Sequence, residues 1–165
     1  MGQIPVKFSA GLLPTTDPAR TSTTPGKRRY ILFDDTIAQK IRITFPMPKT
    51  FGSSLTLFLY LATKNTQTGI KNAGFKVRID ARTPNTDAVD LETDDFDTDN
   101  LISHALANNQ AAGLLRGEEF ALTNIDSVQI GDDVALELER NVGVSDNASG
   151  DIEVLEDAMI SWTDV

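Results

Sequence analysis

Alternating hydrophobic and polar residues predict β-strands along most of this chain. The clearest stretch runs from Phe75 to Arg82, where every second residue is apolar and three of the other four are basic. A period of two is typical of a strand with one buried and one exposed face. Shorter or less regular stretches of the same kind are residues 29–33, 37–45, 55–62, 118–124, 134–140 and 151–162.

The last two of these stretches predict a strand pair joined by one polar loop. Residues 141–150, which lie between them, are rich in Gly, Ser, Asn and Asp. In residues 151–162 one phase contains Ile152, Val154, Ala158, Ile160 and Trp162, and the apolar residues Leu155 and Met159 break it. A β-bulge near Glu156 and Asp157 would restore the phase, so we predict one there.

Two stretches leave alternatives open. Residues 101–115 contain enough Ala and Leu for a short helix, but Ile102, His104 and Leu106 also alternate as in a strand. Residues 55–62 are apolar on both faces. They form either a central strand overlaid by a loop or a strand that places Phe58 and Tyr60 against a partner or a neighbouring subunit.

About eight strands with these spacings suit an antiparallel sandwich or a barrel. The chain has 165 residues, which is the size of one domain. Residues 9–27 contain three prolines and a Ser/Thr cluster with little periodicity. We therefore predict an irregular N-terminal arm over residues 1–28 and a single β-domain over residues 29–165.

The charges are distributed unevenly along the chain. Residues 1–82 contain thirteen Lys and Arg and four acids, whereas residues 83–165 contain two and twenty, for a net charge of −9. Strands from the two halves interleave in an antiparallel sandwich, so we expect opposite charges to meet across strands. Nucleic acid is not an expected partner. The expected pairing is between the acids Glu137, Glu139 and Glu153 and the bases Arg42, Lys76 and Arg78.

The sequence predicts no catalytic centre and no cofactor. It contains no cysteine and one histidine, His104, which excludes disulfides, thiolate chemistry and multi-histidine metal sites. We expect His104 to be structural, and no nucleotide-binding or hydrolase motif is present. The sequence also shows no 18-residue apolar run and no secretory leader, which predicts a protein made in a cytoplasm with no membrane partner.

Two charged clusters are candidate contact sites. Asp95, Asp97 and Asp99 offer closely spaced oxygen ligands of the kind calcium uses, but the glycine and glutamate of an EF-hand are missing. A solvated acidic loop is the alternative, and we predict no bound metal. The second cluster, Lys27, Arg28 and Arg29, is an interface candidate for nucleic acid or an acidic protein surface, or it keeps an exposed strand edge soluble.

Two blocks of the sequence together resemble a known family. They are YILFDDTIAQKIRITFPMPKTFGSSLTLFLYLATKN and SVQIGDDVALELERNVGVSDNASGDIEVLEDAMISW, the second of which contains G-D-x-V-x-L-x-L-x-R. The pairing resembles the jelly-roll capsid decoration (cement) proteins and minor virion structural proteins of tailed bacteriophages.

This resemblance implies a jelly-roll sandwich without enzymatic activity. It would bind the major capsid protein on the outer surface of a phage head as a homotrimer and stabilise the shell, with residues 3–27 carrying shell contacts. The alternative is a carbohydrate- or receptor-binding β-sandwich module of a virion fibre. The scarcity of aromatic residues, 7% of the chain, counts against that alternative because sugar sites often stack rings on aromatic side chains.

Overall fold

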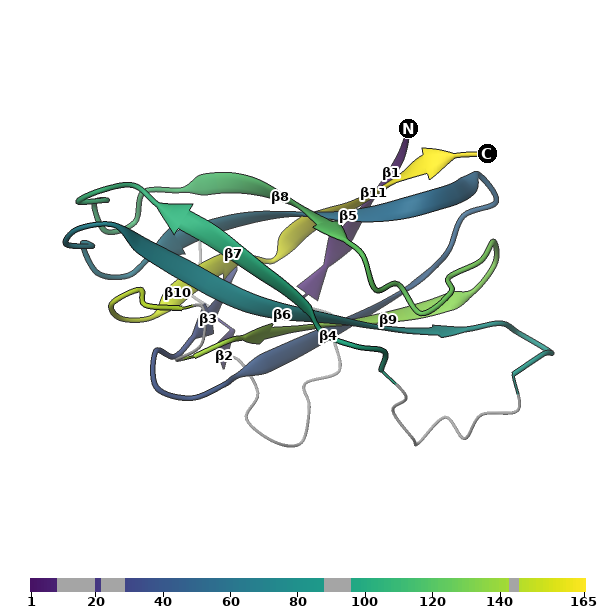
Figure 1. The fold of residues 1–165 in the computed structure, drawn as a ribbon, viewed down its shortest axis with the longest axis horizontal. Helices are drawn as coiled ribbons and strands as arrows, with labels where there is room; N and C mark the ends of the chain where they lie inside the picture. Colours follow the sequence, from purple (N-terminus) through teal and green to yellow (C-terminus); the bar gives the residue numbers. More distant parts are fainter. Residues whose placement is uncertain (9–19, 22–28, 88–95, 143–145) are drawn as a thin grey trace.

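The computed structural model describes residues 1–8, 20–21, 29–87, 96–142 and 146–165. These residues form two antiparallel β-sheets packed face to face, with the N- and C-terminal strands side by side (Figure 1). No α-helix occurs in the described ranges, and hence no helix there could cross a membrane. The all-β sandwich predicted from the alternating pattern is confirmed.

Sheet A is organised around one long strand. Its strands are β1 (Gly2–Lys7), β2 (Arg20–Thr21), β3 (Tyr30–Phe33), β5 (Phe51–Thr63), β8 (Arg116–Leu122), β10 (Ile152–Leu155) and β11 (Asp157–Asp164). The long strand is β5, which pairs with β8 along one edge and with β10 and β11 along the other. Beyond these, β3 pairs with β10, β1 with β11, and β2 with β3.

Sheet B has four strands in the order β4-β9-β6-β7. Its strands are β4 (Lys40–Pro46), β6 (Lys71–Arg82), β7 (Asn100–Leu106) and β9 (Asp133–Arg140). Residues 100–106, for which helix and strand were both open, are therefore a strand, and that strand forms one edge of the sheet.

The core lies between the sheets and is built from the apolar positions of the alternating pattern. Leu55, Leu57, Leu59 and Leu61 of β5 are at most 1% exposed and belong to the same buried cluster as the apolar residues of β6. Two rings from opposite sheets, Phe33 and Phe75, meet edge to face with their centroids 5.6 Å apart. Trp162 is buried as well.

The break in the C-terminal strand falls where the sequence predicts it. Glu156 separates β10 from β11, and both pieces continue to pair with β5. Glu156 lies outside both strands, but its N–H donates to the carbonyl of Arg29 at 3.3 Å and its carbonyl accepts the N–H of Phe8 at 3.1 Å. Its side chain is buried, with Arg29 Nε 3.4 Å from the carboxylate. The inward phase is the same on both sides of the break, at Ile152 and Val154 and at Ala158, Ile160 and Trp162, because the register against β5 shifts there by two residues, from Val154↔Leu61 to Met159↔Phe58.

Two details of the sequence interpretation are wrong. Residues 2–7, assigned to the arm, form β1 in full register with β11. The short alternation of Ile4 and Val6 is interrupted by Pro5, which a strand tolerates here because β1 is at a sheet edge. The pattern predicts a strand over residues 37–45 with Ile37 on its apolar face, but Ile37 is 44% exposed because β4 begins only at Lys40.

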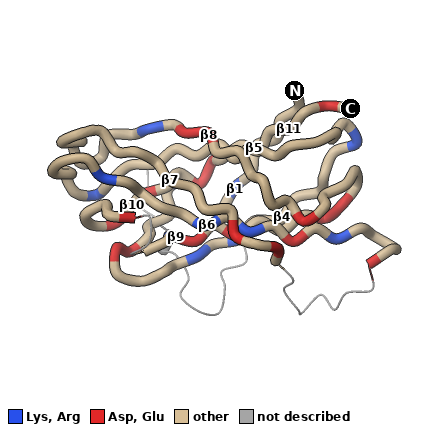
Figure 2. Tube along the Cα trace, in the orientation of Figure 1, with Lys and Arg blue, Asp and Glu red and all other residues tan. Residues whose placement is uncertain are grey.

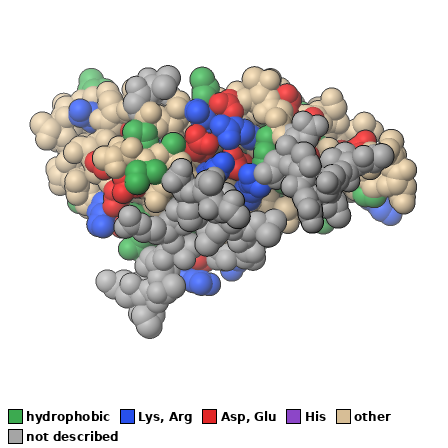
Figure 3. Space-filling model, turned by 90° about the horizontal axis from the view of Figure 1, so that it is seen from below, with side chains coloured by type: hydrophobic (Ala, Val, Ile, Leu, Met, Phe, Trp, Pro, Cys, Tyr) green, Lys and Arg blue, Asp and Glu red, His purple; other side chains and the backbone are tan. Residues whose placement is uncertain are grey.

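The outer face of sheet B carries a network of ion pairs, as the uneven charge distribution predicts. Glu137, only 1% exposed, accepts hydrogen bonds from Arg42 Nε and Arg78 Nη1, both at 2.7 Å. Glu139 pairs with Lys76 and Arg78 at 3.5 and 3.2 Å. Figure 2 shows acidic and basic positions close together along β4, β6 and β9, and the view from below shows both kinds of side chain intermixed between the grey segments (Figure 3).

Residues that follow β6 in sequence complete this network. Asp99 accepts a hydrogen bond from Arg78 Nε at 2.5 Å, and Phe96 lies under the Arg42 guanidinium, 4.8 Å from its ring centroid. Burial opposes the charge on Arg78, but the hydrogen bond to Asp99 and the nearby carboxylates outweigh burial and raise the pKa of Arg78 above its ordinary value.

Candidate functional site

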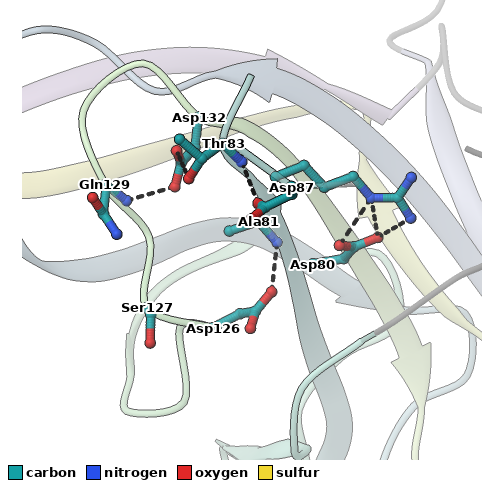
Figure 4. Close-up of a pocket in the computed structure, with 9 residues that line it drawn as sticks. Asp80, Ala81, Thr83, Asp87, Asp126, Ser127, Gln129 and Asp132 are labelled. Atoms are coloured by element: carbon teal, nitrogen blue, oxygen red, sulfur yellow. Dashed lines mark hydrogen bonds and ion pairs between the residues drawn. The ribbon is translucent and has the colours of Figure 1, made fainter. Parts of the chain in front are cut away.

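A polar pocket of about 300 Å³ lies at one end of the sandwich (Figure 4). The end of β6 and the turn after it form one wall, and the loop between β8 and β9 forms the other. The lining residues are Asp80, Ala81, Arg82, Thr83, Asp87, Asp126, Ser127, Gln129 and Asp132. Ligand pockets occupy about 300–1,000 Å³, so this one has room for a small molecule.

The wall contributed by β6 is rigid because its side chains bind one another. Arg82 donates from Nε and Nη2 to the carboxylate of Asp80 at 2.8 to 3.2 Å. The two residues are adjacent because they are two apart on one strand and therefore share a face. In the following turn, the backbone N–H of Thr83 donates to Asp87 Oδ2 at 2.6 Å.

The β8–β9 loop is held against β6 by two aspartates (Figure 4). Asp126 Oδ2 accepts the backbone N–H of Ala81 at 2.7 Å. Asp132, 2% exposed, accepts the Thr83 hydroxyl at 2.9 Å and the backbone N–H of Gln129 at 2.7 Å. These side chains thus fix the loop to the opposite wall of the pocket, next to the point where β9 begins to pair with β6 at Asp133 and Arg82.

Backbone strain is concentrated in this loop. Asp126 and Ser127 both have positive φ angles, 50° and 53°. An L residue in the left-handed region costs roughly 1 kcal/mol or more, and such conformations cluster at ligand-binding sites. The hydrogen bond from Ala81 to Asp126 offsets part of this cost and keeps the Ser127 side chain at the pocket.

The lining is acidic and almost free of apolar groups. Its described residues provide four carboxylates and one guanidinium, and the only apolar residue among them is Ala81. Carboxylate, amide and hydroxyl groups suit a ligand that presents several hydroxyl donors. Thr83 and Ser127 supply hydroxyl groups, but no His or Lys that could activate them as nucleophiles is among the lining residues that the structure describes.

None of the contact or metal candidates selected from the sequence is among the described residues that line this pocket. Of the calcium candidates, Asp95 is outside the described residues, Asp97 accepts the N–H of Thr98, and Asp99 is paired with Arg78. That calcium prediction is not tested by the structure. Lys27 and Arg28 also lie outside the described residues, and Arg29 is exposed beside Glu156.

The aromatic candidates lie on the outer face of sheet A. Phe58 and Tyr60 meet edge to face with centroids 4.8 Å apart. Gly117, opposite Tyr60 in register, leaves space for them, since a Cβ there would lie 2.8 Å from Phe58 Cζ. Tyr60 is 36% exposed and Phe58 is half-buried. Whether they form an interface stays a prediction.

The pocket was not predicted because its residues come from two segments about 45 positions apart in sequence, neither of which carries a recognisable binding motif. The usable signal was local: TPNTD after β6 and NIDS after β8 both place turn-forming, side-chain-capping residues directly after a strand. The alternation of apolar and polar residues does not show which strands pair, so it could not show that these two turns lie side by side.

A second group of carboxylates is explained by loop anchoring. Asp34, Asp35 and Asp151 bring oxygens within 4.8 Å of one another, close enough to share a cation. However, Asp34 accepts hydrogen bonds from Thr36, Asp35 accepts the N–H of Gly150, and Asp151 lies 3.7 Å from Lys64 Nζ. These contacts fasten three loops at the opposite end of the sandwich from the pocket.

Similarity to known proteins is structural only. No family model and no curated protein sequence matches the chain. The fold matches a family 35 carbohydrate-binding module from Clostridium thermocellum with a TM-score of 0.57 and 9% identity, over 99% of this chain and 100% of that one. It also matches the K1 cleaved adhesin domain of Lys-gingipain from Porphyromonas gingivalis W83, with a TM-score of 0.52, 10% identity and 99% of both chains covered.

A third match lies within a larger enzyme. A cycloisomaltooligosaccharide glucanotransferase from Paenibacillus, complexed with cycloisomaltoheptaose, matches with a TM-score of 0.50 and 11% identity, over 94% of this chain and 18% of that one. Together these similarities show that the chain is a jelly-roll β-sandwich.

The expectation of a capsid decoration protein is corrected by these matches. The structures that match over nearly the whole chain are a carbohydrate-binding module and an adhesin domain, and they give no support to a phage-head protein. The two sequence blocks behind that expectation correspond to β3–β5 and β9–β11, so they reflect strand order and turns that unrelated jelly rolls can share. The associated predictions of a homotrimer, a capsid partner and a virion location are not tested by these similarities.

Proposed function

We propose that this protein is a saccharide-binding module without enzymatic activity, and that the polar pocket is its binding site. The observation that carries the proposal is the pocket itself: a preformed cavity of about 300 Å³ lined by carboxylate, amide and hydroxyl groups. The matched modules and the enzyme complexed with a cyclic oligosaccharide support the choice of ligand class.

The bound sugar would be recognised mainly through its hydroxyl groups. The described lining residues include no aromatic ring on which a pyranose could stack, so the binding energy would come from hydrogen bonds to rigidly held acceptors. Hydrogen bonds to charged groups contribute about 1.5–3 kcal/mol each. Asp87 and Gln129 are exposed at opposite walls of the pocket and are positioned to contact a ligand from both sides.

A glycan array followed by calorimetry with the best oligosaccharide tests the proposal. We expect Asp87→Ala and Gln129→Ala each to weaken binding by about tenfold or more, which corresponds to about 1.4 kcal/mol. Both side chains are exposed, so neither variant should prevent folding. The matched control is Glu119→Ala, an exposed acid on the outer face of sheet A. An array without specific hits, or equal affinity of all three variants, would contradict the proposal.

A further inference from the structure

We propose that His104 and Glu118 form an acid-sensitive latch that joins the edges of the two sheets. β7 is the edge strand of sheet B and β8 the edge strand of sheet A, and the two follow each other in sequence across the gap between the sheets. His104 Nδ1 lies 3.0 Å from Glu118 Oε1, so one side-chain hydrogen bond spans this seam.

The imidazole is placed where protonation is costly. His104 is 4% exposed and points into the sandwich, between the inward positions of Ile102 and Leu106. Its Nδ1–H donates to Glu118, while Nε2 is buried with no hydrogen-bond partner in the described structure. Protonation would add a second N–H at Nε2, where the surrounding protein offers no acceptor.

The charges around His104 come from β8. Burial lowers the pKa of His104; Glu118 raises it by its charge and hydrogen bond, and Arg116 lowers it, with a net pKa below the ordinary 6.5. On β6, the residue paired with His104 is Ala73, which carries no charge. The folded protein therefore binds the proton less readily than the unfolded chain. The stability that neutral His104 contributes to the folded protein is therefore complete above about pH 6.5, and it is lost as the pH falls through the folded-state pKa of His104.

The other end of the same seam is held by a side chain that does not titrate. Asn100 donates from Nδ2 to the carbonyls of Val77 and Asn124 at 3.1 and 2.7 Å. Its Oδ1 accepts the backbone N–H groups of Thr123 and Asn124, both at 2.8 Å. Asn124 directly precedes the loop that forms the pocket. Acid should therefore loosen the seam at His104, whereas the end beside the pocket stays closed.

Two measurements on the intact protein test the latch. Because the chain has one histidine, its imidazole NMR signals are unambiguous. We expect a pKa below 6.5 that falls further in Glu118→Gln and rises in Arg116→Gln. Hydrogen exchange, corrected for intrinsic rates, should show at least about a threefold loss of protection at residues 103–106 between pH 7 and pH 5, with little change at residues 100 and 123–124.

The control variant is His104→Asn, whose Nδ2 can replace Nδ1 as the donor to Glu118 but does not titrate. It should abolish the pH dependence of exchange at residues 103–106. If it unfolds the protein, the wild-type titration and the Glu118→Gln and Arg116→Gln shifts still decide the matter. A His104 pKa at or above 6.5, or loss of protection equal at both ends of the seam, would overturn the proposal.

Discussion

The two outer faces of this sandwich differ in how they treat charge. On sheet B, acidic and basic side chains alternate across neighbouring strands, and Glu137 is as inaccessible as a core leucine. On sheet A, the corresponding central positions are Phe58, Tyr60 and Met159, which carry no charge and are half-buried or exposed. An outer face can therefore be closed, meaning that paired charged side chains bury one another, or open, meaning that its aromatic rings stay partly exposed. Only the closed face depends on the presence of every charged side chain in its network.

The largest expected effect comes from removing the central acid of sheet B. Glu137→Gln leaves Arg42 and Arg78 without their shared carboxylate in a nearly inaccessible site. We expect the free energy of unfolding to fall by about 3–5 kcal/mol, measured by urea denaturation. Glu119→Gln, on the exposed face of sheet A, should change it by less than about 0.5 kcal/mol. Similar losses for both variants would show that the two faces do not differ in this way.

A smaller effect is expected from the aromatic pair on sheet A. Phe58→Ala removes a half-buried ring and its edge-to-face contact with Tyr60. The expected loss of unfolding free energy is about 1–2 kcal/mol, again from urea denaturation. Thr56→Ala, two residues earlier on the same face, is the matched control and should cost about 0.5 kcal/mol or less. A loss from Phe58→Ala as large as that from Glu137→Gln would mean that this face is also closed.

The smallest effect should be that of salt on the sheet B network. Raising sodium chloride from about 0.1 M to about 1 M shortens the Debye length from about 10 Å to about 3 Å. Because Glu137 is buried, the cost of Glu137→Gln should change by less than about 0.5 kcal/mol. The exposed pair between Lys7 and Asp157 provides the contrast, since any loss in Lys7→Gln should disappear at high salt. A Glu137→Gln cost halved by salt would contradict the burial argument.

Strand positions and cross-strand charge pairing could be predicted from the sequence because both are local or pairwise. Alternation identified β6 and β9, and the excess of bases in one half and acids in the other predicted the contacts of Glu137 and Glu139 with Arg42, Lys76 and Arg78. Glu153, predicted to join them, lies on sheet A instead, because β10 belongs to the other layer. A period of two specifies a face but not the sheet to which a strand belongs.

The pocket could not be predicted, for a related reason. Its two walls follow β6 and β8, which belong to different sheets, and they meet because β9, which follows the second wall in sequence, pairs with β6. The aspartates that build it carry out turn-stabilising roles that occur in many loops, so their residue types alone do not distinguish a binding site. The acidic run at residues 94–99 became a candidate site instead, because closely spaced acidic residues can be recognised in the sequence without knowledge of the fold.

The pairing of β1 with β11 has a consequence for folding kinetics. Gly2 lies opposite Trp162, and the strand between β1 and β5 in sheet A comes from the C-terminal part of the chain. Most neighbouring strands in that sheet are distant in sequence. Long loops must therefore close, at a cost in entropy, before the pairing of these strands lowers the free energy. We expect folding on the millisecond to second timescale typical of high contact order. Until β11 docks, the long edge of β5 is unpaired, which makes it the segment most prone to association between partly folded chains.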